Sequence, residues 1–371
     1  MKVIVTGTRG IPFIQGGVET YCQALYPRLV EKGVDVTVIT RAFYVAEKKI
    51  IFRGVKLVHL YIPKIQAVEA FFHTFISILY AWINRFPIIH IHAIGPSIFA
   101  PFARFLGLKV VMTHHGQDYN RAKWGKFARR VLKTGERLGV KYSHAVIAIS
   151  EGIKNSIRKL YGRNDTLLLP NGVIIHEKTN DSDYIGSLGI KGQKFIIAVG
   201  RFVPEKGFHD LIEAYRLFKI RSSGLGESIK IVIAGDADYE TPYSMRLKQL
   251  ARDNRVILTG FITWQLLRQL YSHTILFVLP SYHEGTSMAL LEALSFGIDV
   301  LTSDISANME VGLDRDSYFR VGNIPDLSEN IGRKLTTSSS KNYFDLLERK
   351  YNWENVASGM YSVFSELSKK K

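Results

Sequence analysis

Two acids, Glu284 and Glu292, stand eight positions apart in the segment PSYHEGTSMALLEALSFG, residues 280–297. Carboxylates accept hydrogen bonds, and beside a bound phosphate ester they commonly hold sugar or ribose hydroxyls. Between them, Gly-Thr-Ser at 285–287 precedes a stretch of helix-forming composition, and a helix N-terminus binds anions through its N–H groups and dipole. The segment therefore predicts a site for a phosphorylated, hydroxyl-rich ligand, with both acids facing one cleft. A surface helix with a Glu at each end is the alternative.

Two cations, Arg201 and Lys206, stand in the loop GRFVPEKG at residues 200–207. This loop follows the apolar run Phe195–Gly200, and the acidic segment follows the apolar run Ile275–Leu279. Both runs are typical of buried strands, and open parallel sheets bind ligands beyond the carboxyl ends of their strands. Two cations at such a crevice suit a diphosphate, although solvated loop charges give the same pattern.

The first forty or so residues have the pattern of a βαβ unit. Lys2–Thr6 and Val34–Thr40 are strand-like runs, separated by a glycine-rich loop and a helix with apolar residues at helical spacing. The pattern predicts a parallel sheet of Rossmann type. Further strands are expected at 88–92, 109–113, 145–149, 195–200, 230–235, 256–260, 275–279 and 299–302.

A chain of 371 residues is long enough for two domains. We expect a Rossmann-like N-terminal domain at 1–185 and a second one at 186–356, with the polar stretch Glu177–Gly192 as the linker. A final amphipathic helix begins near Trp353. For the last part of this helix, about residues 357–371, we consider packing against the first domain.

The composition describes a globular protein, with 46% hydrophobic and 22% charged residues. Its one cysteine, Cys22, excludes an intramolecular disulfide and suits a reducing cytoplasm. The net charge of +16 is concentrated in residues 1–185, which hold 26 Lys and Arg against 12 Asp and Glu, whereas residues 186–371 hold 23 against 21. The asymmetry predicts an anionic partner for the first half, unless the basic surface only aids solubility.

Basic residues cluster in Asn120–Tyr142, which has the pattern of a basic amphipathic helix. The apolar stretch Ala67–Ile83 is shorter than the roughly 20 residues that span a bilayer, and indicates a core or an interfacial helix. No DNA- or RNA-binding motif occurs in the sequence. An anionic membrane surface is therefore the expected partner, and nucleic acid is not.

Two alternatives concern other chemistry. His114 and His115 follow the strand at 109–113, and with His90 and His92 they suggest a zinc site, but no cysteine or acid stands at ligand spacing. The opening VTG followed by glycines is also typical of nicotinamide-dependent sugar-modifying enzymes. Against that, Phe13 occupies the place of the third glycine, and the second strand ends without an acid to hold a ribose.

Taken together, the chain resembles the retaining glycosyltransferases of family 4. These have the α/β GT-B architecture, two Rossmann-like, doubly wound parallel-sheet domains facing across a cleft. The motifs that carry the resemblance span nearly the whole chain: Gly16-Gly17-Val18-Glu19, Thr113-His114-His115-Gly116, Pro170-Asn171-Gly172-Val173, Gly200-Arg201 with Lys206-Gly207, and Glu284-x7-Glu292. The opening GTRGIP…GGVET is similar to enzymes that build bacterial surface polysaccharides. Ile298-Asp299 and Ser306 depart from the family pattern and leave the loop shape there open.

The resemblance implies a role for each matching position. Arg201 and Lys206 are expected to neutralise the departing diphosphate of the donor, so that no metal and no cofactor is required. Glu284 is expected to bind sugar hydroxyls, Glu292 the ribose, and His115 is placed beside the transferred sugar. The remaining donor-binding positions are Gly16, Gly17, Asn171, Gly285, Thr286 and Ser287.

The implied activity is sugar transfer, with retention, from a nucleotide-diphosphate-sugar to a glycan or polyprenyl-diphosphate-linked acceptor. From the single cysteine and the charge asymmetry, we expect a cytoplasmic location, peripheral on the inner face of the plasma membrane. Two other functions stay open from the residues alone. One is an NAD(P)-dependent nucleotide-sugar epimerase or dehydratase, and the other is a non-catalytic nucleotide-sugar binder.

Overall fold

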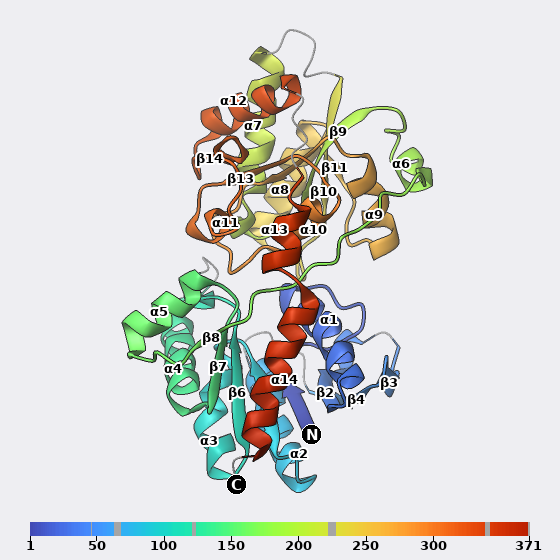
Figure 1. Cartoon of the computed structure of the whole chain (residues 1–371). Coiled ribbons are helices and arrows are strands. Elements are labelled where there is room, and N and C mark those ends of the chain that lie inside the picture. Colours follow the sequence, from blue (N-terminus) through green and yellow to red (C-terminus); the bar gives the residue numbers. More distant parts are fainter. Residues whose placement is uncertain (46, 63–67, 121–123, 222–227, 338–341, 370–371) are drawn as a thin grey trace. The chain divides into compact units, whose positions relative to one another are not determined.

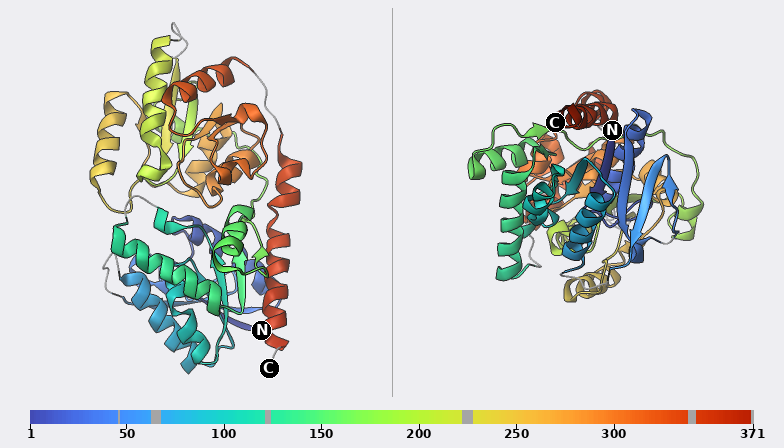
Figure 2. Two further views of the ribbon diagram at one scale, coloured as in Figure 1. Left: turned by 90° about the vertical axis from the view of Figure 1, so that its left-hand side faces the viewer. Right: turned by 90° about the horizontal axis from the view of Figure 1, so that it is seen from below.

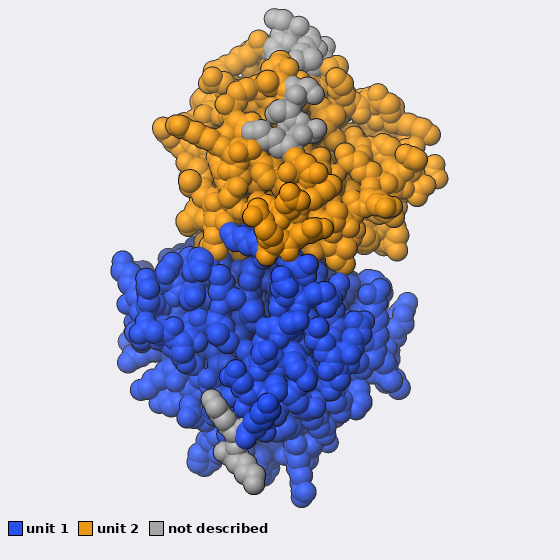
Figure 3. All heavy atoms as spheres, in the orientation of Figure 1, with its two compact units in different colours: residues 1–172, 350–371 blue, residues 173–349 orange. Residues whose placement is uncertain are grey.

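The computed structural model of the chain describes residues 1–45, 47–62, 68–120, 124–221, 228–337 and 342–369 (Figure 1). The chain divides into two compact units, coloured separately in Figure 3. Unit 1 comprises residues 1–172 and 350–371, and unit 2 comprises residues 173–349. Each unit is built on its own sheet.

Unit 1 contains a sheet whose paired strands are parallel except at one edge, where β3 runs antiparallel to β4. The central strands are buried along nearly their whole length, because helices cover both faces. In spatial order the strands are β3 (Ile51–Phe52), β4 (Val55–Leu60), β2 (Asp35–Arg41), β1 (Lys2–Thr6), β5 (Ile88–His92), β6 (Lys109–His114), β7 (Ala145–Ala148) and β8 (Leu167–Leu168).

The helices of unit 1 separate onto the two faces of this sheet (Figure 2). Ile4, Ile89 and Ile91 pack with residues of α2 and α3 on one face, and their neighbours His90 and His92 contact α1 and α14 on the other. The elements are α1 (Gly17–Glu31), η1 (Ala42–Tyr44), α2 (Glu69–Ile83), η2 (Pro96–Phe99), α3 (Ala100–Phe105), η3 (Asp118–Asn120), α4 (Lys126–Tyr142), α5 (Glu151–Tyr161) and α14 (Trp353–Lys369).

Unit 2 contains a second sheet in which every paired strand is parallel. In spatial order the strands are β11 (Ile257–Leu258), β10 (Ile229–Ala234), β9 (Lys194–Val199), β12 (Leu276–Leu279), β13 (Val300–Ser303) and β14 (Tyr318–Phe319). The helices α7, α8 and α12 pack on one face, and α9 and α10 on the other. The elements are α6 (Asp183–Ser187), η4 (Pro204–Lys206), α7 (Phe208–Arg221), α8 (Pro242–Asp253), α9 (Trp264–His273), α10 (Met288–Ser295), α11 (Ser306–Met309), η5 (Arg315–Ser317), α12 (Ile324–Thr336) and α13 (Phe344–Lys350).

The division between the units falls after Gly172, whereas the sequence places the boundary at residue 185. The intervening stretch belongs to unit 2 because its backbone is bonded there. The N–H of His176 donates to the carbonyl of Ser295 (3.1 Å), and that of Tyr184 donates to the side chain of Gln269 (2.9 Å). The expected linker at 177–192 also contains the short helix α6.

The strand orders define where each unit can bind a ligand. In both sheets the first strand, β1 or β9, lies between the second strand and a strand that follows later in the chain. Loops from two adjacent strands diverge at such a switch point, and α/β sheets bind ligands in the opening beyond the carboxyl ends. In unit 2 the two loops are 200–207 after β9 and 280–287 after β12.

Several element boundaries differ from those expected. The basic helix begins at Lys126, and Arg121 and Lys123 lie outside the described residues. The stretch expected as one helix at 96–106 starts as the 3-10 turn η2 and becomes α3 at Ala100. Among the helices of the described ranges, none is long and apolar enough to cross a membrane.

Candidate active site

Hydrogen bonds and close packing hold together the two loops at the switch point of unit 2. The N–H of Tyr282 donates to the carbonyl of Glu205 (2.8 Å). Gly207 has φ +65°, and a Cβ at this position would lie 2.1 Å from the carbonyl oxygen of Pro280. Only glycine allows this approach without displacing backbone. The loop with Arg201 and Lys206 and the loop with Glu284 are therefore packed against each other.

Lys206 and Glu284 meet at the centre of these loops. The Nζ of Lys206 donates to Oε1 of Glu284 (2.6 Å), and the Ser281 hydroxyl donates to the same oxygen (2.7 Å). Both charged side chains are mostly buried, 19% and 10% exposed. This pairing places a cation and a carboxylate, both predicted to contact the donor, beside the carboxyl ends of β9 and β12.

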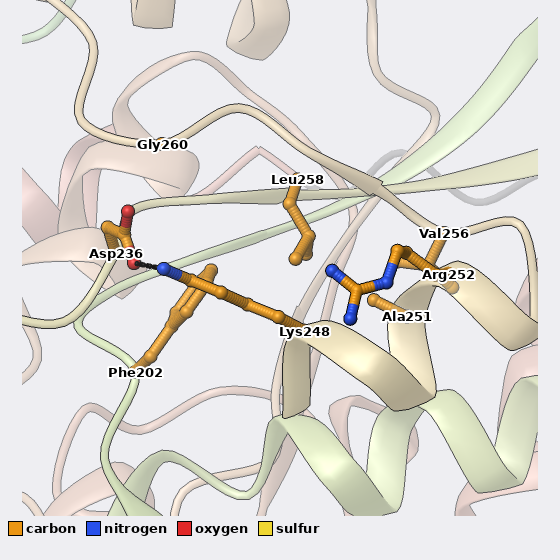
Figure 4. Close-up of a pocket in the computed structure, with 8 residues that line it drawn as sticks. All are labelled: Phe202, Asp236, Lys248, Ala251, Arg252, Val256, Leu258 and Gly260. Carbon is orange, nitrogen blue, oxygen red and sulfur yellow. Dashed lines mark ion pairs between the residues drawn. The ribbon is translucent and has the colours of Figure 1, made fainter. Parts of the chain in front are cut away.

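Arg201 pairs with an acid of the loop that follows β10. Its Nη1 donates to Oδ2 of Asp238 (3.1 Å). A second acid of this loop, Asp236, pairs with Lys248 of α8 (2.9 Å), at one wall of a pocket that Leu258 and Arg252 also line (Figure 4). Each acid of Asp236-Ala237-Asp238 is thus partnered by a cation, and Asp238 positions the Arg201 guanidinium.

Gly285, Thr286 and Ser287 lead into the N-terminus of α10, as predicted. Ser287 is the N-cap residue, and its side chain caps no helix N–H. Its hydroxyl oxygen is buried and has no hydrogen-bond partner among the described residues. A buried hydroxyl next to the free N–H groups of a helix start is a suitable donor set for phosphate oxygens.

Glu292 lies on the next turns of α10 and contacts α9. The hydroxyl of Tyr271 donates to its Oε2 (3.2 Å). Burial raises the pKa of the Glu292 carboxyl to about 7. The hydrogen bond from Tyr271 has the opposite, smaller effect and lowers this pKa. Glu284 and Glu292 therefore differ in their surroundings, since one carboxylate faces a lysine and the other a tyrosine.

In unit 1, His115 follows β6 at the carboxyl edge of the sheet. Its Nε2 shares a hydrogen bond of 2.8 Å with Nδ1 of His92, and the Tyr21 ring packs edge-on against it (centroids 5.2 Å apart). Burial, and next the neighbouring His114, lower the pKa of His115 to about 3. The imidazole is therefore neutral at physiological pH and suits hydrogen bonding to a sugar.

Gly16 and Gly17 stand at the start of α1, where Glu19 already lies close. A Cβ at Gly16 would lie 2.0 Å from Oε2 of Glu19. The other carboxylate oxygen of Glu19 accepts the N–H of Arg9 (2.9 Å). Asn171 is buried in the segment that ends unit 1. In this unit the structure brings His115 together with His92 and Tyr21 rather than with the predicted glycines.

The predicted residues of unit 2 are only partly brought together. Lys206 and Glu284 contact each other directly, whereas among the described residues Arg201 pairs with Asp238 and Glu292 with Tyr271. Sequence reasoning did not identify Tyr26 or Asp238 as neighbours of the site, and it grouped His92 with His115 only as part of the zinc alternative. The alternation IHIH in β5 places His90 and His92 on one face of the strand, and this signal could have shown that they face α1. In the described part of the chain, no group of three or more His, Cys, Asp or Glu is placed to hold a metal ion.

Each half of the chain matches the model of a known protein family. Residues 15–177 match the family model described as "Glycosyltransferase Family 4", and residues 180–345 match "Glycosyl transferases group 1". The two sheets and these matches define a GT-B protein. The chain belongs to the family-4-like glycosyltransferases. This membership does not favour the nicotinamide-dependent alternative.

Individual relatives are distant but match over long stretches. The chain is 24% identical over 397 residues to the uncharacterized glycosyltransferase MJ1607 of Methanocaldococcus jannaschii, with 98% of each chain covered. It is 30% identical over 226 residues to TuaC of Bacillus subtilis, named for teichuronic acid biosynthesis, covering 59% of this chain and 53% of TuaC.

Two solved structures show the same fold over the whole chain. Sucrose-phosphate synthase of Thermosynechococcus elongatus superposes with a TM-score of 0.83 at 19% identity, covering 100% of both chains. Anabaena HepE, in complex with UDP and glucose, superposes with a TM-score of 0.78 at 17% identity, covering 98% and 99%.

Proposed function

We propose that this glycosyltransferase moves a sugar from a nucleoside-diphosphate-sugar to a glycan acceptor, with retention of anomeric configuration and without a metal ion. The contact between Lys206 and Glu284 at the switch point of unit 2 carries the proposal. It places a cation suited to a diphosphate next to a carboxylate suited to sugar hydroxyls. The complexes of HepE, a protein of the same fold, with UDP-glucose and with UDP and glucose support this donor class.

The proposed reaction replaces one bond to the anomeric carbon with another on the same face of the sugar. The bond to the diphosphate oxygen breaks and the bond to an acceptor hydroxyl oxygen forms, while the acceptor proton passes to the departing phosphate. Negative charge grows on the diphosphate as it leaves, so fixed cations and N–H groups stabilise the transition state more than the ground state. Arg201, Lys206 and the start of α10 fill this role.

The other predicted residues bind and orient. Glu292 accepts hydrogen bonds from the ribose hydroxyls, Glu284 accepts them from the sugar, and His115 contacts the transferred sugar as a neutral imidazole. No side chain is required as a nucleophile in this scheme.

Ligand binding and turnover test the proposal separately. A thermal-shift panel of nucleoside diphosphates and their sugars identifies the donor, because a ligand at 100 times its dissociation constant adds about 2.7 kcal/mol of stability. Donor hydrolysis or transfer by the wild type then separates an enzyme from a non-catalytic binder. Stabilisation by a reduced dinucleotide, with none by any nucleotide sugar, contradicts the proposal.

We further propose a bacterial surface glycan, or its polyprenyl-diphosphate-linked precursor, as the acceptor. Two relatives support this class: TuaC, and the O-antigen chain mannosyltransferase RfbU of Salmonella typhimurium, which is 26% identical over 175 residues. An acceptor of this kind is anchored in the membrane, which connects the proposal to the basic helix α4.

The exposed face of α4 supports binding to the inner face of the plasma membrane. Phe127 on α4 is 82% exposed and Phe105 at the end of α3 is 85% exposed, and apolar side chains among cations are typical of interfacial helices. Each cation near an anionic surface contributes about 1 kcal/mol. The exposed cations of α4 are Lys126, Arg129, Arg130, Lys133, Arg137 and Lys141.

Vesicle sedimentation tests the membrane surface. The wild type is expected to bind vesicles that contain anionic lipid, to bind neutral vesicles weakly, and to be released by salt. Arg129→Glu with Arg130→Glu should abolish binding, whereas the same charge change at Arg246 and Arg252 of α8 should not. Equal loss in both double variants, or binding that ignores lipid charge, contradicts the proposal.

A further inference from the structure

A chain of hydrogen bonds runs from the interior of unit 1 to His115. It begins at the Thr113 hydroxyl, which shares a hydrogen bond with Nε2 of His90 (2.7 Å). Nδ1 of His90 contacts the Tyr26 hydroxyl (2.9 Å), and the same hydroxyl contacts Nε2 of His92 (2.5 Å). Nδ1 of His92 then contacts Nε2 of His115 (2.8 Å). Every link lies within hydrogen-bond range.

The hydrogens of this chain can point in only two concerted directions when all three imidazoles are neutral. Each neutral imidazole has one N–H and one acceptor nitrogen, and the tyrosine hydroxyl donates once. If Tyr26 donates to His90, then His92 donates to Tyr26, His115 donates to His92, and Nδ1 of His115 is an acceptor. If Tyr26 donates to His92, every bond reverses, and Nδ1 of His115 carries a hydrogen.

The neighbouring histidine shows a different arrangement. The backbone N–H of Gly116 donates to Nδ1 of His114 (3.2 Å), so that Nε2 of His114 donates to Glu136 (2.8 Å). A carboxylate thus fixes the His114 tautomer. Among the described residues, the links recorded for His115, His92 and His90 include no carboxylate.

Aromatic rings pack around the chain, and His90 and His92 are fully buried. The Tyr21 ring packs against His115 and His92, and the Phe364 ring of α14 packs against His90 (centroids 5.6 Å apart). The titratable groups that interact electrostatically with His115 include His114 and Asp118 in its own loop and His90 and His92 on β5. Burial lowers the pKa of His90 to about 3, and it lowers the pKa of His92 as well.

We propose that Tyr26 and His92 are positioning residues for sugar transfer: their hydrogen bonds fix the His115 ring and allow its Nδ1 to act as donor or acceptor toward a sugar hydroxyl. The inference rests on the proposed function, since it assigns His115 to the transferred sugar. Among the described residues nothing hydrogen bonds to Nδ1 of His115, so that this atom is available to a ligand. The Thr113 hydroxyl, on β6, is the member of the chain farthest from His115 along these hydrogen bonds.

Nuclear magnetic resonance of protein labelled with ¹⁵N-histidine tests the chain without any donor. In the wild type, the ring nitrogens of His90, His92 and His115 should stay neutral between about pH 8 and pH 5. The signals of His92 and His115 should lie between those of a bare nitrogen and an N–H, because both directions are populated. A charged His115 ring at pH 6 overturns the proposal.

Two tyrosine variants, each of which loses one buried hydroxyl, test the positioning role. Tyr26→Phe removes the central hydroxyl and should leave one His115 tautomer, with kcat about tenfold lower and the donor KM little changed. Tyr215→Phe removes a buried hydroxyl that donates to the backbone carbonyl of Ile229 in unit 2, and should keep the wild-type His115 signals and kcat. Unchanged His115 signals in Tyr26→Phe, or an equal loss of kcat in both variants, overturns the proposal.

If Tyr26→Phe does not fold, the pH titration of the wild type is by itself a test of the proposal. The outcomes also separate this inference from the proposed function. A wild type with the expected ring signals but no transfer from any nucleotide sugar contradicts the proposed function and leaves the hydrogen-bonded chain in place.

Discussion

Lys206 and Glu284 stand 78 positions apart in the sequence, yet the lysine Nζ lies 2.6 Å from a carboxylate oxygen of Glu284. Each side chain neutralises the other in a partly buried place. A diphosphate that binds Lys206 would therefore replace part of the negative charge that Glu284 supplies to the lysine. The Glu284 carboxylate could then accept hydrogen bonds from sugar hydroxyls. The pairing keeps both groups oriented until the donor arrives.

Lys206→Ala should lower kcat/KM by about a hundredfold or more, since it removes the cation that we propose stabilises the departing diphosphate. Steady-state kinetics with the identified donor measures this. Lys194→Ala is the matched control, because Lys194 is exposed at the opposite, amino end of β9. Unchanged rates in Lys206→Ala and Glu284→Ala together would refute the site.

Arg201→Ala should weaken the binding of nucleoside diphosphates about tenfold while leaving the melting temperature of the free protein nearly unchanged. The Arg201–Asp238 pair is partly exposed, 23% and 26%, and such pairs contribute about 1 kcal/mol or less to stability. Isothermal titration calorimetry measures the affinity. Arg216→Ala, which breaks the exposed pair with Glu213, should leave it unchanged.

Gly207→Ala should destabilise the protein by about 2 kcal/mol or more and reduce donor binding, because the new Cβ would lie 2.1 Å from the carbonyl of Pro280. Gly162→Ala provides the control. Gly162 has nearly the same φ, +68°, but open space around its Cβ position, so that only the backbone strain of roughly 1 kcal/mol applies. Chemical denaturation compares the two, and equal losses would exclude the close approach as the cause.

Glu292→Gln should change how stability depends on pH. The folded carboxyl has a pKa of about 7, raised by burial from 4.5, so that the folded state binds a proton that the unfolded chain has released. This contribution to stability is fully present below pH 4.5 and is lost as pH rises to about 7. At pH 8 the variant should be more stable than the wild type, by an amount on the order of 2 kcal/mol. Identical pH profiles of stability in the variant and the wild type would show that the pKa of the Glu292 carboxyl is not raised in the folded protein.

Much of the fold follows from local sequence patterns. The apolar runs before Gly200 and Pro280 predict buried parallel strands, and β9 and β12 confirm them. The helix-forming stretch from Met288 is confirmed as α10. Strands, loops and helices could be predicted because each depends mainly on residues that are close in the sequence, and the parallel arrangement follows from the βαβ pattern. The predicted GT-B fold is confirmed by the two sheets and by the solved structures of the same fold.

The partners of the site residues depend on tertiary packing and could not be predicted. Tyr26 stands at helical spacing among apolar residues and suggests a core position, but its hydroxyl joins two histidines of another element. Asp238 belongs to a chance-level Asp-x-Asp pattern, and only the return of the chain along β10 brings it to Arg201. Hydrophobic periodicity gives the face of an element but not the polar atom across from it.

The helix α14 has a consequence for biosynthesis. It packs against α1 and against His90 of β5, in the part of the protein that the ribosome makes first. During synthesis, Tyr21 and His90 therefore lack the cover that α14 provides until residues 173–349 have been made and α14 itself follows. Expressed alone, residues 1–172 would lack this cover, whereas a permuted gene that joins residues 350–371 directly to the first half would restore it.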